Sequence, residues 1–157
     1  MLFEIFKIKM TIKKSNIKIA IVASKFNSSI VDRLYNGAIA TFKENGITEN
    51  EIKLISVPGA FEIPVAVKTL LNKKIYDVII TLGVIIRGET PHFEFIANEC
   101  AHGISRLAIT SGTPIIFGIL TVNNKDQALK RSGSEGRNKG VEAAKAALDM
   151  VEALQNI

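Results

Sequence analysis

The segment Val78-Ile-Ile-Thr-Leu-Gly-Val-Ile-Ile-Arg-Gly-Glu-Thr-Pro-His-Phe93 joins a strand to the start of a helix. Its first nine residues are almost all apolar, which is typical of a strand covered on both faces. After Gly88, Thr90 is a suitable N-cap, with Pro91 at the first helical position and His92 at the second. The free N–H groups of such a helix start attract anions, and an imidazole there can move protons. The alternative is a plain helix cap with an exposed histidine beside it.

The rest of the chain repeats this alternation of strand and helix. Short apolar or alternating runs predict further strands at 18–23, 51–57 and 114–122. Apolar residues at helical spacing predict helices at 30–44, 61–71, 91–111 and 141–154, and a short helix between 124 and 140 that glycines interrupt. In the helix at 91–111 we expect Phe93, Ile96, Cys100, Ile104 and Leu107 to be buried. The pattern predicts a three-layer α/β/α sandwich with a four-stranded parallel, flavodoxin-like sheet.

The chain is predicted to divide into an N-terminal arm, residues 1–16, and a single domain, residues 17–157. In the arm, Phe6, Ile8, Met10 and Ile12 alternate with polar residues, as in a half-buried strand. This arm is either disordered, folded over its own domain, or added to the sheet edge of a neighbouring subunit.

Composition favours a globular cytoplasmic protein. The chain has 157 residues, 47% of them hydrophobic, and its only cysteine, Cys100, allows no internal disulfide. The net charge is +5, and five of the lysines lie in the first eighteen residues. These lysines do not alternate with aromatic residues on which nucleotide bases could stack, so nucleic acid is not an expected partner. No run approaches the ~18 apolar residues of a membrane span, so no membrane contact is expected either.

Residues 83–90 nearly match the phosphate loop G-x-x-x-x-G-K-[ST]. Glu89 stands where that loop has its lysine, and a carboxylate there would repel a triphosphate. The first four residues also belong to the predicted strand, so the glycine loop is missing. ATP and GTP are therefore poor candidates, whereas a small metabolite with one phosphate fits better.

Ligands of parallel α/β sheets bind at the carboxyl ends of the strands. Those ends carry Phe26, Phe61 and the segment that contains His92. Phe26 and Phe61 can stack on a flat heterocycle, although each is also a common core residue. In the basic segment after the fourth strand, Arg131 can clamp a phosphate; the alternative is a solvated arginine in a loop.

Together these segments resemble the 6,7-dimethyl-8-ribityllumazine synthase family over residues 17–155. The motifs that carry the resemblance are Ala23-Ser-Lys-Phe-Asn27, Val57-Pro-Gly-Ala-Phe-Glu-Ile-Pro64, R-G-x-T-x-H at 87–92, Phe117-Gly118, and Arg131 with Asn138-Lys-Gly140. The resemblance implies a transferase of riboflavin biosynthesis that needs neither cofactor nor metal. It would condense 5-amino-6-(D-ribitylamino)uracil with 3,4-dihydroxy-2-butanone 4-phosphate to 6,7-dimethyl-8-ribityllumazine, phosphate and water.

The resemblance also implies where the substrates bind. His92 would be the catalytic residue that moves protons. The implied ribitylaminouracil site comprises Phe26, Ala60, Phe61, Glu62, Val84, Ile85, Ile86 and Phe117, and the implied butanone phosphate site comprises Glu89, Thr90 and Arg131. Phe117 and Arg131 would come from the adjacent subunit of a homo-oligomer, a pentamer or a 60-subunit shell, and riboflavin synthase is a further partner that the resemblance suggests.

One segment departs from the family pattern. Glu135 stands where a lysine is usual, which reverses a charge near the phosphate site, and Arg137 could compensate. Three alternatives stay open beside the synthase: a noncatalytic flavin- or pterin-binding module, a purely structural shell-forming protein, and a riboflavin synthase. The last typically has a β-barrel, which the alternation of strands and helices argues against.

Overall fold

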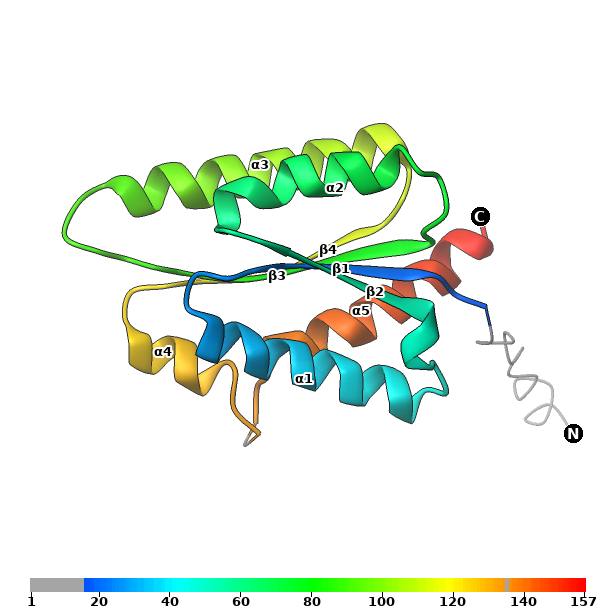
Figure 1. Ribbon diagram of the computed structural model, residues 1–157, viewed down its shortest axis with the longest axis horizontal. Helices are drawn as coiled ribbons and strands as arrows, with labels where there is room; N and C mark the ends of the chain where they lie inside the picture. The colour runs from blue at the N-terminus through cyan, green and yellow to red at the C-terminus, as the bar shows by residue number, and fades with distance from the viewer. Residues whose placement is uncertain (1–15, 135) are drawn as a thin grey trace, which may run out of the picture.

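A parallel sheet forms the middle layer of the computed structural model, which describes residues 16–134 and 136–157 (Figure 1). The strands are β1 (Ile19–Ser24), β2 (Ile52–Val57), β3 (Val78–Ile86) and β4 (Ile115–Val122). They lie in the order β2-β1-β3-β4, and each pair is parallel. The strand predicted within residues 1–13 lies outside the described residues.

Helices cover both faces of this sheet (Figure 1). One face carries α1 (Ser28–Glu44), α4 (Lys125–Lys130) and α5 (Lys139–Gln155); the other carries α2 (Ile63–Leu71) and α3 (His92–Ser111). Two 3₁₀ turns, η2 (Glu49–Glu51) and η3 (Ala60–Glu62), flank β2. The predicted three-layer α/β/α sandwich is therefore confirmed.

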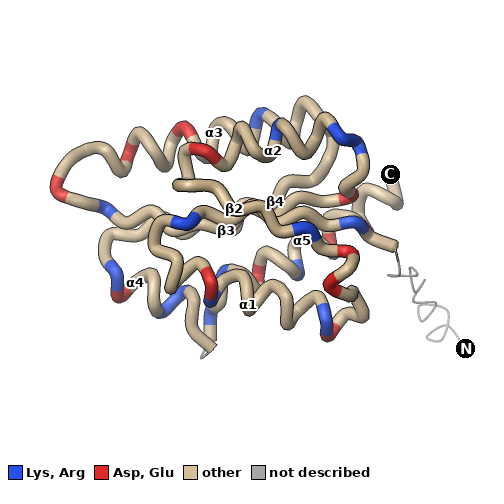
Figure 2. The backbone as a smooth tube through the Cα atoms, viewed as in Figure 1, with Lys and Arg blue, Asp and Glu red and all other residues tan. Residues whose placement is uncertain are grey.

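Strand periodicity divides the core into two apolar clusters. Along β1, Ile19 and Ile21 pack with the cluster beneath α1 and α5, whereas Ala20 and Val22 pack with the cluster beneath α2 and α3. The central strands β1 and β3 are buried on both faces, as their apolar runs predicted. Charged residues lie mainly on the outer helices, the turns and the strand ends (Figure 2).

The start of α3 differs from the sequence prediction by one residue. Thr90 was the predicted N-cap, but α3 begins at His92, Pro91 takes the cap position, and no side chain caps the helix. The reason is local: the Glu94 N–H donates to the Pro91 carbonyl oxygen at 3.0 Å, which closes a tight first turn. The prediction of Thr90 as the cap, with Pro91 inside the helix, was wrong.

The start of α5 is fixed by Asn138. Its Oδ1 accepts hydrogen bonds from the N–H groups of Gly140 (2.8 Å) and Val141 (3.2 Å), which satisfies two free donors of the helix. Its Nδ2 donates to the Ser132 carbonyl oxygen at 2.9 Å and lies 3.3 Å from that of Arg33 in α1. One side chain thus joins α5 to α1 and to the segment that follows Arg131.

Cys100 lies fully buried in α3, and burial raises the pKa of its thiol to about 11. Among residues 16–134 and 136–157, none of the helices has both the length and the apolar character that a bilayer crossing needs.

Candidate functional site

A cavity of about 660 Å³ opens at the carboxyl ends of β1, β2 and β3, beside the first turns of α3. We call it the sheet-end pocket. Its lining residues are Phe26, residues 59–62, residues 84–86, Gly88, Thr90, His92, Phe93 and Ile96. Ligands of parallel α/β folds bind at this edge, because loops from several strands meet there.

Most predicted site residues line this one pocket. They are Phe26, Ala60, Phe61, Glu62, Val84, Ile85, Ile86, Thr90 and His92. Glu89 is exposed in the turn before α3 and does not line the pocket. Phe117 and Arg131 lie elsewhere in the same chain.

The rim of the pocket carries two exposed aromatic rings. Phe26 is 72% exposed and Phe61 is 56% exposed, so neither is a core residue. The Phe26 N–H donates to the Pro58 carbonyl oxygen at 3.1 Å, which continues the pairing of β1 and β2 past their ends. Exposed aromatic side chains at a cavity rim are suited to stacking on a flat ring.

Two turns set the position of these rings. Asn27 follows Phe26 in the left-handed region (φ 58°), and its Nδ2 donates to the Val84 carbonyl oxygen at 3.3 Å. Asparagine tolerates this backbone conformation better than most residues. On the other side, the Glu62 carboxylate accepts a hydrogen bond from the Gly59 N–H at 2.9 Å and closes the η3 turn that presents Phe61.

Two residues of the pocket, Phe93 and Ile96, were assigned to the core by sequence reasoning. Both are half-buried: they pack against the apolar cluster and also line the sheet-end pocket. They are the first two members of the apolar stripe of α3, at the end nearest the strand ends. That position was the only signal in the sequence that distinguished them from the rest of the stripe.

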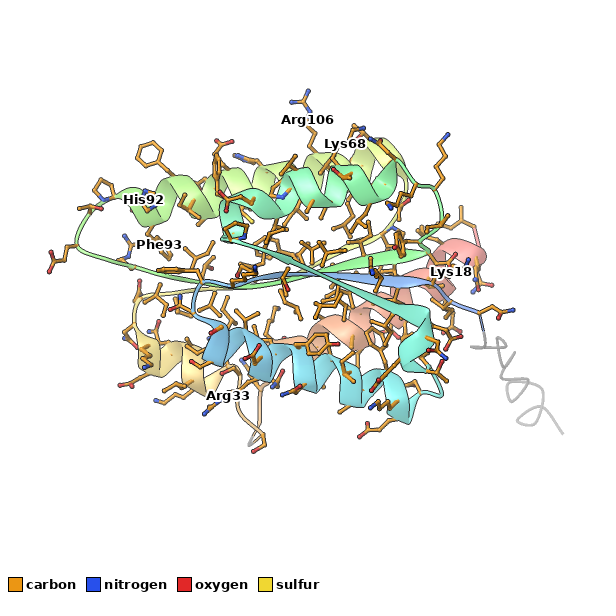
Figure 3. All side chains as sticks on the ribbon, viewed as in Figure 1. Lys18, Arg33, Lys68, His92, Phe93 and Arg106 are labelled. Atoms are coloured by element: carbon orange, nitrogen blue, oxygen red, sulfur yellow. The ribbon has the colours of Figure 1, made fainter. Side chains whose placement is uncertain are left out.

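His92 lies at the exposed end of α3, and Phe93 beside it faces the sheet (Figure 3). The guanidinium of Arg87 lies 4.6 Å from the centroid of the Phe93 ring. Its Nη1 is 3.1 Å from Oε1 of Glu94, and its Nε donates to Oδ1 of Asn123 at 3.1 Å. Arg87 therefore connects the first turn of α3 to the segment after β4.

A second cavity, of about 610 Å³, lies along β4 and contains Phe117 and Arg131. We call it the cationic pocket. Its lining residues are Phe117, residues 119–122, Gln127, Lys130, Arg131, Arg137 and Lys139. Within the described residues, no carboxylate lies within ion-pair distance of Lys130, Arg131 or Arg137. This concentration of positive charge is suited to an anion such as phosphate.

The two pockets have no lining residue in common. Phe117 and Arg131 therefore do not join His92 within one chain. In the described part of the chain, no group of three His, Cys, Asp or Glu side chains is arranged to hold a metal ion.

A comparison with protein families finds one match over nearly the whole chain. The model of the family described as 6,7-dimethyl-8-ribityllumazine synthase matches residues 16–155. The matched range contains every helix and strand of the described structure and the lining residues of both pockets.

Proposed function

The chain belongs to the 6,7-dimethyl-8-ribityllumazine synthase family, a family of transferases in riboflavin biosynthesis, and from that premise we propose its reaction. It condenses 5-amino-6-(D-ribitylamino)uracil with 3,4-dihydroxy-2-butanone 4-phosphate to 6,7-dimethyl-8-ribityllumazine, phosphate and water, without a cofactor. The observation that carries the proposal is the grouping of Phe26, Phe61 and His92 around one cavity at the strand ends.

The sheet-end pocket holds the ribitylaminouracil in this proposal. Phe26 stacks on the pyrimidinedione, and Val84, Ile85 and Ile86 form an apolar floor beneath the ring. The η3 turn, residues 60–62, contacts the ribityl chain and the ring edge. An apolar cavity with a few polar groups at its rim is the usual form of a small-molecule site.

The chemistry needs proton transfer more than a strong nucleophile. The 5-amino group of the uracil attacks the ketone, and a first water leaves as an imine forms. Elimination of phosphate leaves an enol that becomes a carbonyl. The ribitylamino nitrogen attacks this carbonyl and closes the ring with loss of a second water. Each step moves a proton to or from nitrogen, oxygen or carbon, which an imidazole does well near neutral pH. His92 is the proposed group, because it lines the pocket and is exposed at the start of α3. Holding both substrates together lowers the barrier further.

The phosphate is bound between two subunits. Backbone N–H groups of the turn at Glu89 and Thr90 meet it from one chain, and Arg131 meets it from the cationic pocket of a neighbour. The separation of the two pockets within one chain supports this arrangement, because neither pocket holds both His92 and Arg131. Phe117 reaches the ring pocket of the neighbour in the same way.

The subunits form a homo-oligomer, with a pentamer as the proposed unit and a 60-subunit shell as its larger form. Large exposed apolar side chains on the helical layer formed by α2 and α3 support an interface there: Val65 is 65%, Phe95 69% and Ile109 81% exposed. Exposed apolar groups gathered on one layer are typical of surfaces that bind another protein.

Incubation of the purified protein with both substrates tests the reaction directly. We expect the fluorescent lumazine and one phosphate per turnover, and no product when the butanone phosphate is omitted. Folded protein that binds riboflavin or the product without turnover would instead indicate a noncatalytic binding module. Light scattering of the same sample reports whether the chain assembles.

Arg131→Ala raises the KM for the butanone phosphate about tenfold, because a lost charged hydrogen bond costs about 1.5 kcal/mol. The KM for the ribitylaminouracil stays near that of the wild type. Initial rates at varied butanone phosphate measure the effect, and Arg33→Ala, which removes an arginine of α1 that lines neither pocket, is the matched control. An unaltered KM in Arg131→Ala would remove Arg131 from the phosphate site.

Mixed assemblies of two impaired variants test whether the site is shared. When His92→Ala and Arg131→Ala chains are unfolded and assembled together, some interfaces join an intact His92 to an intact Arg131. In a random mixture of a head-to-tail ring, about a quarter of the interfaces do so. At low butanone phosphate we expect about a quarter of the wild-type rate, well above the mean of the two variants measured apart. A rate equal to that mean would place both residues in one chain's site.

A further inference from the structure

The turn that carries His92 has few contacts of its own. No side chain caps α3, and residues 87–92 are all exposed. A Cβ built on Gly88 would meet nothing within 4 Å, so no other part of the chain packs against the turn at this residue. The backbone around His92 is therefore held by contacts that lie on either side of the turn.

Arg87 supplies those contacts. Its backbone N–H donates to the Val122 carbonyl oxygen at 2.9 Å, which extends the pairing of β3 with β4 by one residue. Its side chain then makes three contacts in different directions: with Asn123 after β4, with Glu94 in α3, and with the ring of Phe93. A guanidinium is planar and its N–H groups are fixed in one plane, so three simultaneous contacts define its orientation.

From this geometry we infer that Arg87 is a positioning residue, which holds the first turn of α3, and with it His92, against the carboxyl end of the sheet. The inference rests on the proposed function for its effect on turnover. Phe93 and Glu94 follow His92 directly, so fixing these two residues fixes the direction in which the imidazole leaves the helix. Phe93 also lines the sheet-end pocket, so the same contact places one wall of it.

Arg87 is not expected to bind the phosphate itself. It does not line the sheet-end pocket or the cationic pocket, and its Nε and Nη1 are already engaged. Nor is it expected to stabilise the fold appreciably, because its ion pair with Glu94 has side chains that are 44% and 57% exposed. Its effect is geometric, and displacement of a reacting group by about 1 Å can slow an enzyme about a hundredfold.

Arg87→Met tests the inference, because methionine keeps an unbranched side chain and removes all three polar or cationic contacts. We expect kcat to fall about tenfold while both KM values change less than about twofold, the pattern of a lost transition-state interaction. Arg87→Lys should recover part of kcat, since an ammonium can still pair with Glu94. Lys43→Met is the matched control: it breaks an exposed ion pair, Lys43 with Glu49 at 2.6 Å, at the far end of α1.

Amide hydrogen exchange measures the positioning without reference to activity. In Arg87→Met we expect faster exchange in peptides covering residues 88–96 and unchanged exchange in α1 and α5. Wild-type exchange at 88–96 would overturn the inference, and so would an unchanged kcat. A raised KM for the butanone phosphate with unchanged kcat would also overturn it, in favour of direct phosphate binding. If the wild type makes no lumazine, the proposed function fails, while the exchange result still decides whether Arg87 holds the turn.

Discussion

His92→Ala lowers kcat about a hundredfold and leaves the affinity for both substrates nearly unchanged, as loss of a general acid–base group does in other enzymes. His92 is exposed and is one of thirteen residues that line the pocket, and in the proposed binding mode the ring contacts Phe26, Phe61 and residues 84–86. Removing the imidazole should therefore remove proton transfer and leave most of the proposed binding surface in place.

Single-turnover kinetics and equilibrium binding of the product separate these two effects. The chain has two histidines, and His102 provides the control because it is exposed on the outer face of α3, away from the sheet-end pocket. We expect His102→Asn to keep the wild-type kcat. If purified His92→Ala turns over at the wild-type rate, the proton transfers must be assigned to another group or to water.

Gly140→Ala destabilises the fold by about 3 kcal/mol or more, the upper end of what overpacking costs, because its methyl group would collide with main-chain atoms. A Cβ at this position overlaps the backbone carbonyl oxygen of Leu34, and both residues lie within helices that cannot move independently of the core. A flexible side chain could rotate away from such a collision, but a helical carbonyl group cannot.

Thermal unfolding measures the loss, which for a chain of this size corresponds to a decrease in Tm of about 10 °C. Gly88→Ala is the control, since open space surrounds that residue and its φ is not positive, and we expect its Tm to stay within about 2 °C of the wild type. Gly37→Ala should lie between them. Its Cβ would come within 2.6 Å of Oδ1 of Asn138. The Asn138 side chain can move away, but α5 would then lose its N-cap. A wild-type Tm for Gly140→Ala would mean that α1 and α5 can separate without cost.

Local patterns were sufficient to predict the layers of this fold. The apolar run at 78–86 and the helical stripes on either side of it depend only on near neighbours in sequence, and a helix between successive strands makes the sheet parallel. The start of α3 was harder, because residue type favours Thr90 over Pro91 as the N-cap, whereas the structure has Pro91 there. The choice between them depends on the hydrogen bond from Glu94 to Pro91, which the residue types alone do not determine.

The candidate site was partly predictable for the same reason. The rule that ligands bind at strand ends is enough to bring Phe26, Phe61 and His92 to one place from their positions in the sequence. The rule also brings Arg87 and Asn123 to this edge of the sheet, but it does not predict the hydrogen bond between their side chains, which are 36 positions apart in the sequence. The role of Arg131 stays a prediction, because its exposed position in the cationic pocket is compatible both with phosphate binding and with solvation.

The separation of the two pockets has a consequence for how the protein behaves at low abundance. If each site is completed by a neighbouring chain, an isolated chain is folded yet unable to work, and specific activity must depend on the protein's own concentration. Dilution below the dissociation constant of the assembly would then abolish the activity without unfolding the chain. A cell that expresses only traces of this chain would then gain little activity from them, and flux would rise more steeply than expression until assembly is complete.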